Sequence, residues 1–441
     1  MDFFLNFDWN ALIDRIGNNP FEAMWFLFIN GGWIIFLIVI AWCAILLFQM
    51  RNQDKFNAAK QWVIFAIHIP RMHEQGPRAI ENMFAYLAGA HSPNSWTEDW
   101  FVGKTQDNIS CEIVSIEGNV QFFIRTTRPL QDLVEAAVYA QYPDAEVTEV
   151  EDYTLKVPKH YPDEEWDVWG TQFVGTKSDI YPIKTYPMFE DKVSGEFKDP
   201  MSAFLESLSR VGKGEQVWFQ ILLIPIAQKE FSAKANLLVK KLTGQKVEHK
   251  KTWADHAAEI PVSILSELAS VAFGGGGEHA KPAPKKPDAA PSKIQHMTEG
   301  EKEVVTNIEN KAGKIVFKVK LRLVYVAKKT AMNKARVANT VIGAIKQINS
   351  NHMQSLKPDS AHVGMNSTLW WFKSMRNNER KTHLMSAYRG RSGSMGLPPM
   401  HLSTEELATL WHFPHSLQVK TPQLRKTDNK KAEPPANIPF E

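Results

Sequence analysis

The longest uninterrupted hydrophobic segment of the chain is MWFLFINGGWIIFLIVIAWCAILLF, from Met24 to Phe48. Its 25 residues include no Asp, Glu, Lys, Arg or His. A bilayer core about 30 Å thick is crossed by about 20 apolar residues in a helix. The pattern therefore predicts a transmembrane helix over residues 24–48, with a buried core helix as the alternative. Residues 1–23 have apolar positions near helical spacing, which predicts either an amphipathic N-terminal segment or a frayed terminus.

The region 61–154 alternates between two hydrophobic periods. Apolar runs typical of strands lie at residues 62–69, 109–116, 120–125 and 145–150. Apolar residues at helical spacing lie at residues 77–88 and 129–142. This order, β-α-β-β-α-β, is the ferredoxin-like pattern, so we expect a first ferredoxin-like unit here.

The region 166–374 shows the same order once an insertion at 229–311 is set aside. Strand patterns lie at 166–189, 216–226, 314–327 and 368–372, and helical patterns at 199–209 and 331–348. The insertion contains helical stretches at 229–241, 253–271 and 298–310 and a Gly- and Pro-rich linker at 274–293, which is predicted to be disordered. The expected fold class is therefore α+β: an N-terminal transmembrane helix followed by two ferredoxin-like units, the second with a helical and disordered insertion.

The remaining residues, 375–441, form no further unit of this kind. We expect a basic loop at 375–400, a short helix at 403–411 that begins with a capping box, and a disordered tail from Lys420. An apolar stripe on the short helix consists of Leu407, Leu410 and Trp411. This stripe could dock a partner, or it could simply pack on the second unit.

Charge is distributed unevenly, although the net charge of +3 is too small to argue for a nucleic-acid partner. Asp144 to Asp167 holds nine acids against two lysines, a net of −7. Met375 to Lys431 holds ten Lys and Arg against four acids, a net of +6. Two surfaces of opposite sign could serve docking, although solvated charge is the commoner explanation.

The charges that flank the apolar segment predict an orientation. Residues 1–23 carry four acids and a single Arg15, whereas Arg51, Lys55 and Lys60 follow the segment. The positive-inside rule then places the amino terminus outside and the long carboxyl portion in the cytosol, in a cytoplasmic (inner) membrane. The amino end also lacks the basic cluster of a cleavable signal. The two cysteines, Cys43 and Cys111, are too far apart in this arrangement to pair, which fits a reducing compartment.

Sequence motifs for catalysis or metal binding are weak. Residues 170–178, GTQFVGTKS, resemble a phosphate-binding P-loop, but Thr176 separates the second Gly from Lys177 and no helix pattern follows. His401, His412 and His415 lack a carboxylate or Cys partner at ligand spacing, and His160 beside Asp163, Glu164 and Glu165 is a charged loop of ordinary kind. We therefore expect no catalytic residue, no cofactor and no metal.

A ferredoxin-like sheet raises the possibility of RNA or single-stranded DNA binding. Phe122 and Phe123 are adjacent, so only one of them can lie on a given face, and the basic-glycine-aromatic signature of RNA-recognition modules is missing. A better candidate is a set of five basic side chains that could track phosphates: Arg376, Arg380, Lys381, Arg389 and Arg391. A solvated basic loop is the alternative for this segment.

Two longer runs resemble a known but uncharacterised family. They are QFFIRTT with Arg128 and Leu130–Tyr153 in the first unit, and LSTEELATLWHFP at 402–414, followed by Val419–Pro422 and PPANIP at 434–439. This family is a membrane-anchored domain of small-genome bacteria. In its longer members it leads into a coupling ATPase similar to those of conjugation and type IV secretion. The present chain ends at Glu441, before such a motor, so the resemblance implies the membrane and adaptor half.

Three hypotheses follow. The leading one is a non-enzymatic single-pass membrane adaptor that docks a separately encoded P-loop translocation ATPase through the helix at 403–411 and the tail. The second is a membrane-tethered protein that binds single-stranded nucleic acid, such as DNA, through the basic side chains at 376–391. The third, an enzyme, has no supporting group of residues. A homo-oligomer is compatible with all three.

Overall fold

The computed structural model describes residues 20–29, 33–70, 75–191, 197–244, 297–365 and 371–414. Several expectations lie outside these residues: most of the N-terminal segment, the helical stretch at 253–271, the linker at 274–293 and the tail. The chain divides into two compact units. The first comprises Met1–Trp62, His91–Asp107 and Thr127–Pro129, and the second comprises Val63–Ala90, Asn108–Thr126 and Leu130–Glu441.

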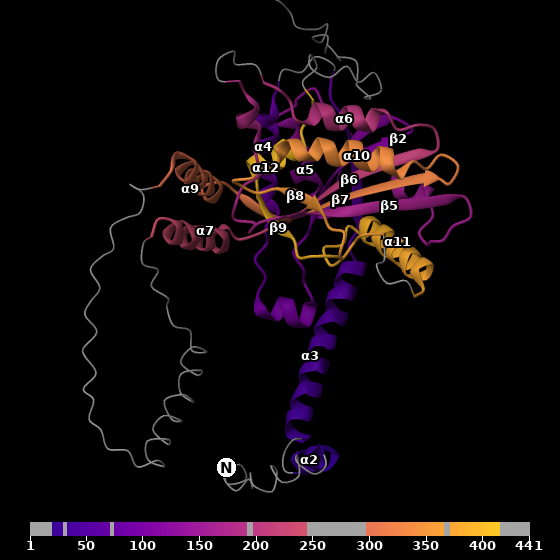
Figure 1. Ribbon diagram of the computed structural model, residues 1–441, viewed down its shortest axis with the longest axis vertical. Coiled ribbons are helices and arrows are strands. Elements are labelled where there is room, and N and C mark those ends of the chain that lie inside the picture. Colours follow the sequence, from indigo (N-terminus) through magenta and orange to yellow (C-terminus); the bar gives the residue numbers. More distant parts are fainter. Residues whose placement is uncertain are drawn as a thin grey trace, which may run out of the picture. The chain divides into compact units, whose positions relative to one another are not determined.

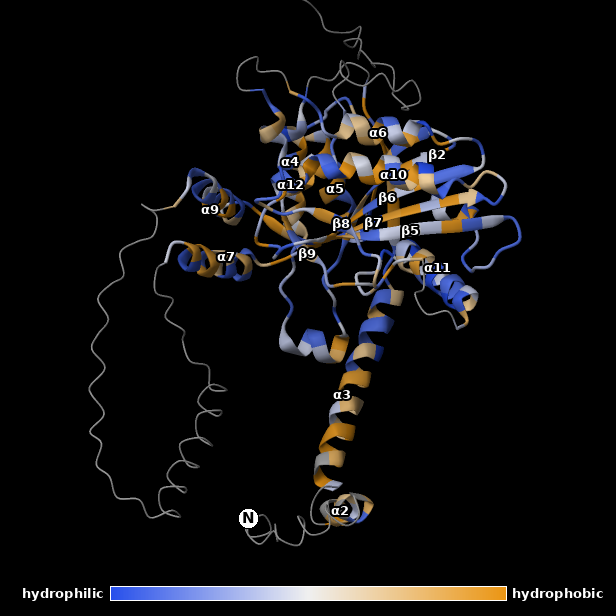
Figure 2. Ribbon diagram, viewed as in Figure 1, coloured by the Kyte–Doolittle hydropathy of each residue, from blue (hydrophilic) through white to orange (hydrophobic). Residues whose placement is uncertain are grey.

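The first unit contains the apolar segment. Helix α2 spans Pro20–Leu27, and helix α3 spans Trp33–Ala58. Within the described part of the chain, one helical stretch, Phe36–Ala58, is long and apolar enough to cross a membrane, and none of it is buried. Figure 2 shows hydrophobic residues along much of α3 and hydrophilic ones near its C-terminal end.

The described residues of the predicted transmembrane segment are helical. Within the predicted span 24–48, residues 24–27 lie in α2 and residues 33–48 in α3, and residues 30–32 lie outside the described part of the chain. The apolar run ends at Phe48, but α3 continues to Ala58. The sequence that follows Phe48, QMRNQDKFNA, is rich in good helix formers, so the helix continues after the apolar pattern has ended.

The second unit is built on one large antiparallel sheet. The described strands are β1 (Trp62–His68), β2 (Ile109–Ile116), β3 (Asn119–Thr127), β4 (Glu146–Glu149), β5 (Trp166–Gly175), β6 (Glu215–Pro225), β7 (Val316–Lys328), β8 (Leu356–Pro358) and β9 (Met400–Ser403). Their spatial order is β4-β1-β3-β2-β6-β7-β5-β8, and β9 pairs with β7. Strands β2 and β6 join the two halves of this sheet, with Glu112 opposite Gln220.

Helices cover both faces of the sheet, as Figure 1 shows. One face carries α4 (Pro77–Leu87), α5 (Gln131–Tyr139), α6 (Met201–Ser209), α10 (Lys334–Ile345) and α12 (Thr404–Leu410). Phe219 of β6 contacts Phe204 of α6 on this face, with ring centroids 5.1 Å apart. On the opposite face, Trp218 contacts Tyr388 of α11 (Lys373–Arg389), with centroids 5.2 Å apart. Burial of both faces explains why β6 is almost continuously apolar.

The insertion contributes two described helices. These are α7 (Gln228–Leu242) and α9 (Glu299–Ala312), which lie against each other beside the sheet (Figure 1). Phe231, Ala235 and Ile308 form a small separate core between them with Val316. A capping box of Thr298 and Glu301 begins α9.

The α+β class and the apolar N-terminal helix are thus confirmed, and the described strands form one large antiparallel sheet. Two elements differ from expectation. Residues 375–400 were expected to form a loop, but the first half of this segment lies in α11, a helix of 17 residues. A last strand was expected at 368–372, but Trp371 and Phe372 lie in a turn, residues 366–370 lie outside the described part, and the edge strand beside β5 is β8.

Candidate functional site

The predicted docking stripe on α12 lies in the core. The exposed fractions of Leu407, Leu410 and Trp411 are 0%, 4% and 0%. The Trp411 ring contacts Phe84 and Phe122, with centroid distances of 6.0 and 5.4 Å. The stripe therefore packs in the core, as its alternative interpretation held. Trp411 contacts the first predicted ferredoxin-like region, and Leu410 lines a cavity with Phe204 and Ile345 of the second. A side chain in this position is not available to a partner.

A buried ion pair also holds α12 in place. The Lys311 ammonium lies 3.0 Å from Glu406, and the exposed fractions of the two side chains are 1% and 0%. Lys311 also donates to the carbonyl oxygens of Asp179 and His401, each at 2.8 Å. Glu406 accepts hydrogen bonds from the backbone N–H groups of Ile183 and Ser403, so both charges are compensated. Helix α12 is thereby joined to α9 and to the loop after β5.

The five predicted phosphate-binding side chains are distributed along α11 and just after it. Arg376 is partly exposed, as is Arg380, which donates to the carbonyl oxygen of Gly364 at 2.7 Å. Lys381 forms an ion pair with Asp167 at 2.5 Å. Arg389 donates to the carbonyl oxygens of Thr154 and Val157. Arg391 is fully buried. Four of the five predicted basic side chains, all except Arg376, are therefore bonded to carbonyl or carboxylate groups of the protein itself.

Arg391 belongs to a buried polar cluster on the face that α11 covers. We call it the Glu112 cluster, and its members are Glu112, Asp152, Tyr153, Gln220, Tyr388 and Arg391. Arg391 Nε and Nη2 lie 3.0 and 3.1 Å from the two carboxylate oxygens of Glu112. Its Nη1 contacts Asp152 and donates to the carbonyl oxygen of Arg389 at 2.8 Å. The fork of the guanidinium thus meets the carboxylate bidentately.

Neutral donors complete the coordination of the Glu112 carboxylate. It accepts from Ser110 Oγ and Tyr153 Oη, each at 2.7 Å, and from Gln220 Nε2 at 2.9 Å. The Tyr153 and Tyr388 hydroxyls lie 2.8 Å apart. The cluster takes Glu112 from β2, Gln220 from β6, Tyr388 from α11 and Asp152 from the loop after β4. It therefore connects the two halves of the sheet with the elements that cover them.

Electrostatics keep the cluster in one protonation state near neutral pH. Burial raises the pKa of Glu112, but the Arg391 guanidinium and the surrounding hydrogen bonds lower it more, so the net pKa lies below its usual range. Burial, with the Glu112 charge, raises the pKa of Tyr153 well above its usual value. The carboxylate is therefore ionised and the phenol protonated. An arrangement this enclosed is suited to holding elements together, because a reactant cannot reach it.

The other predicted motifs are not brought together. His412 Nε2 lies 2.9 Å from Asp199, whereas His401 Nδ1 lies 2.5 Å from Asp179. Among the residues that the structure describes, no three His, Cys, Asp or Glu side chains are placed to hold a metal ion. The P-loop-like sequence forms the end of β5 and the turn after it, where Lys177 donates to backbone carbonyls. Burial in β2 raises the pKa of the Cys111 thiol.

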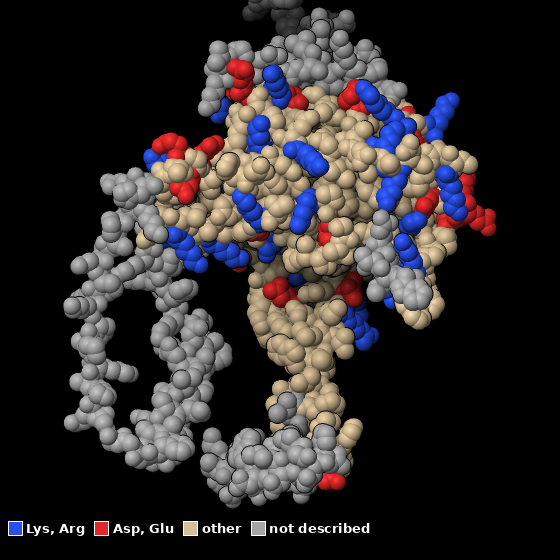
Figure 3. All heavy atoms as spheres, in the orientation of Figure 1, with Lys and Arg blue, Asp and Glu red and all other residues tan. Residues whose placement is uncertain are grey.

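The sheet aromatics are covered as well. Phe122 and Phe123 are 3% and 5% exposed. Phe122 packs on Trp411 and Phe123 stacks on Tyr153, so neither presents an open platform for a base. Figure 3 shows Lys and Arg side chains scattered across the visible face of the second unit rather than gathered in one patch.

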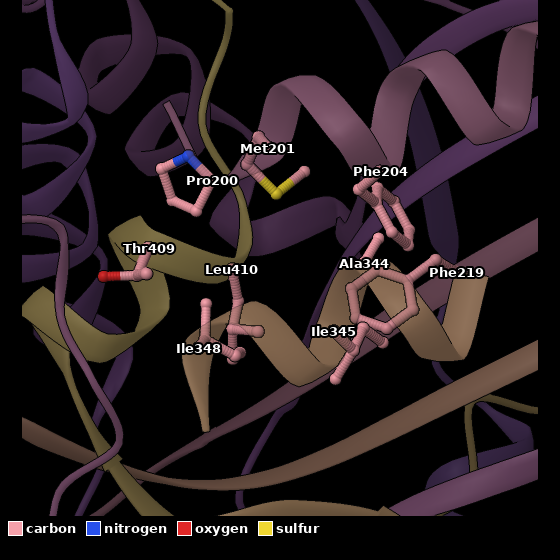
Figure 4. A pocket seen from close by; sticks show the side chains of 9 residues that line it. All are labelled: Pro200, Met201, Phe204, Phe219, Ala344, Ile345, Ile348, Thr409 and Leu410. Atoms are coloured by element: carbon pink, nitrogen blue, oxygen red, sulfur yellow. The ribbon is translucent and has the colours of Figure 1, made fainter. Parts of the chain in front are cut away.

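Cavities in the second unit differ in size and character. An apolar cavity between α6, α10 and α12 is lined by Phe204, Phe219, Ile345 and other side chains that converge in Figure 4. Its volume is about 20 Å³, enough for a water molecule and far below the 300 Å³ or so of a ligand pocket. A larger open groove, about 650 Å³, runs between Tyr161 and the start of α11. Phe372 and Met375 line it and are 73% and 69% exposed.

The chain is thus an α+β protein with an apolar N-terminal helix, a large antiparallel sheet and charged groups buried in pairs. It belongs to the family described as Domain of unknown function (DUF8128), whose model matches residues 50–427. The match begins just after the apolar run ends at Phe48 and includes both the Glu112 cluster and α12. A comparison with curated proteins finds no match for the chain.

The two buried ion pairs are the features that the sequence analysis missed. One signal was present, because Glu112 interrupts the apolar strand ISCEIVSI and a charge at such a position needs a partner. The identity of that partner is a tertiary fact, since Arg391 lies 279 residues away along the chain.

Proposed function

We propose that the chain is a non-enzymatic, single-pass membrane adaptor that holds a rigid α+β scaffold at the membrane surface. The observation that carries this proposal is α3, whose apolar stretch is entirely unburied within its unit. Figure 3 shows that the surface along this helix is almost free of charged side chains. An apolar helix of this length that no protein core covers fits a lipid environment.

The proposed orientation places the amino terminus outside and the second unit in the cytosol, at a cytoplasmic membrane. Arg51 and Lys55 support it, because both are exposed on α3 just after its apolar run. The positive-inside rule assigns this end to the cytosol. A cytosolic second unit also fits Cys111, a free and buried thiol.

The scaffold itself is proposed to be two ferredoxin-like units that share one sheet. Strand orders β4-β1-β3-β2 and β8-β5-β7-β6 support this, since each is the 4-1-3-2 order of that fold. The helices α7 and α9 would then belong to an insertion in the central hairpin of the second unit. The Glu112 cluster lies where these two ferredoxin-like units meet, within the second compact unit.

The partner stays a prediction from the family resemblance: a P-loop translocation ATPase of the conjugation or type IV secretion kind, encoded separately. The α12 stripe is buried, so we place the contact on the exposed groove at Phe372 and Met375. Apolar side chains exposed side by side in this way favour a protein partner. Oligomerisation of the anchor is compatible with this arrangement.

The proposal is tested by affinity purification of the full chain from its native membrane in mild detergent, followed by mass spectrometry. We expect recovery of a P-loop ATPase, and loss of that recovery with Met375→Glu. Leu155→Glu is the matched control, because Leu155 is 72% exposed and lies outside the groove. If no motor is recovered, the proposed partner is contradicted. If the motor is recovered equally with both variants, the proposed contact at Met375 is contradicted.

The nucleic-acid alternative is weakened by the contacts of its basic side chains, since carbonyl and carboxylate groups of the protein already hold four of them. It predicts an affinity for single strands that falls steeply with salt. Binding that is absent at about 50 mM salt would remove this alternative.

A further inference from the structure

The first unit contains a second apolar feature besides α3. Residues 91–107, which we call the aromatic loop, include the π-helix η3 (Glu98–Val102). Its large apolar side chains face solvent: Trp96 is 66% exposed, Phe101 63% and Val102 54%. The Trp96 ring lies 6.2 Å from that of Trp100 and 6.0 Å from that of Phe101. Such a cluster is unfavourable in water and indicates a binding surface.

The aromatic loop runs along α3 with its tip toward the apolar end of the helix. Lys60 Nζ lies 2.7 Å from Asp107. Thr105 Oγ1 donates to Asn57 Oδ1 at 2.7 Å. Further along, Asn52 Nδ2 donates to the carbonyl oxygen of Trp100 at 3.1 Å. At the tip, the Phe101 ring lies 6.5 Å from Phe48. The contacts with α3 therefore step from residue 60 down to residue 48.

Direct backbone contact fixes this alignment. Gly103 has a φ of +73°, in the left-handed region, and a Cβ built there would lie 2.3 Å from the carbonyl carbon of Asn52. Only glycine allows the loop to approach the helix this closely. The short helix η3 is the violet one beside α3 in Figure 1.

Helix geometry gives the height of the aromatic cluster. Phe48 is the last residue of the apolar run. At 1.5 Å per residue, Asn52 lies about 6 Å and Asn57 about 13 Å beyond it along the axis. The Phe101 ring is thus level with the end of the apolar run, where a bilayer changes from acyl chains to headgroups. Aromatic rings, Trp above all, concentrate at this depth.

The charges of the loop set a limit on its depth. Glu98 accepts from the backbone N–H of Ser95 at 2.9 Å and lies 3.4 Å from Lys104. Asp99 follows it at the tip. Two carboxylates next to the rings keep the loop at the headgroup level, because a charge in the acyl region costs several kcal/mol. Exposed Arg51 and Lys55 on α3 favour anionic headgroups at the same level.

We propose that the aromatic loop is a second membrane anchor, in which Trp96, Phe101 and Val102 insert into the headgroup boundary of the bilayer that α3 spans. The occupant is lipid rather than protein because the loop is continuous with the apolar surface of α3. This inference rests on the proposed membrane function. It would fix the rotation and tilt of α3 at the cytosolic surface.

The test places an environment-sensitive fluorophore at single cysteines of the full chain, reconstituted into phosphatidylethanolamine and phosphatidylglycerol vesicles. Lipids with a nitroxide near the top of the acyl chain act as quenchers in both leaflets, so the orientation of insertion does not matter. The reporter is Trp96→Cys in a Cys43→Ala background; Cys111 is buried and stays. Ser92→Cys is the matched control, because Ser92 is exposed and bonds to Gln106, next to the Thr105 that contacts Asn57.

The expected result is a blue-shifted, quenched signal at position 96 and a water-like, unquenched signal at position 92. Val102→Cys, on the same tip, should behave as position 96 does and guards against a local effect of losing Trp96. A water-like signal at both 96 and 102 would overturn the inference. A label on native Cys43, in the apolar run of α3, separates the aromatic-loop proposal from the transmembrane proposal. Quenching at Cys43 alone contradicts insertion of the aromatic loop and leaves the α3 span intact. Absence of quenching at all labelled sites contradicts the span itself.

Discussion

Removal of the Arg391 guanidinium is the perturbation whose effect follows most directly from the structure. In Arg391→Met the side chain keeps much of its length but loses its charge. Glu112, which is completely buried, then loses both of its charge-assisted hydrogen bonds, at 3.0 and 3.1 Å. Breaking a buried pair by removing one partner costs about 3–5 kcal/mol of unfolding free energy.

We expect the lower half of that range. Three neutral donors, Ser110, Tyr153 and Gln220, still bond to the Glu112 carboxylate and partly replace the lost guanidinium. A loss of this size corresponds to a fall in melting temperature on the order of 10 °C. Arg210→Met is the matched control. Arg210 pairs with Glu206 at 3.0 Å but is 73% exposed, so its removal should change the unfolding free energy by less than about 0.5 kcal/mol.

The assay is thermal and urea unfolding of the full chain in detergent micelles, followed by near-ultraviolet circular dichroism. The double variant Glu112→Gln with Arg391→Met should be less destabilised than the sum of the two single variants by at least about 1 kcal/mol, because it leaves no unpaired buried charge. If Arg391→Met melted within about 2 °C of the unmodified chain, as Arg210→Met should, the proposed role of the Glu112 cluster would be refuted.

Three further results are expected. Burial raises the pKa values of Glu112 and Asp199, but Arg391 beside Glu112 and His412 beside Asp199 lower them more, so both lie below their usual range. The two carboxylates therefore stabilise the folded state fully above about pH 5, and this stabilisation is lost as pH falls below about 4. A melting temperature that stays flat from pH 6 to pH 3 would speak against this. Trp411→Ala should cost about 3–5 kcal/mol by urea unfolding, since it empties a core site. Gly103→Val should release the aromatic loop from Asn52 and expose it to protease, and an unchanged cleavage pattern would argue against the close contact.

Much of the fold of the second unit follows from hydrophobic period because its long central strands pack on their neighbours over most of their length. Strand β6 is apolar on both faces, and it is covered on both. Helix α11 could not be predicted in this way. Its buried residues are confined to its C-terminal end, from Leu384 to Tyr388, so the first eleven residues have no apolar period. Strand β8 is three residues long, too short for any alternation to be seen.

The candidate site was less predictable than the fold. The apolar stripe of α12 was visible, and so was its capping box, but neither says whether the stripe faces a partner or the core. The basic residues after 375 looked like one surface, whereas Arg391 is buried and Lys381 pairs with Asp167. Which charge meets which is decided by strand pairing, since β2 and β6 bring Glu112 beside Gln220 and under α11. Hydrophobic pattern carries no information on such pairs.

The central claim is that α3 crosses a membrane and leaves the second unit in the cytosol. We would test it on membranes from the native cell, by alkaline carbonate extraction followed by protease treatment of spheroplasts. We expect the chain to stay in the membrane pellet and external protease to leave the second unit intact. Release of the chain by carbonate, or digestion of the second unit from outside, would contradict it.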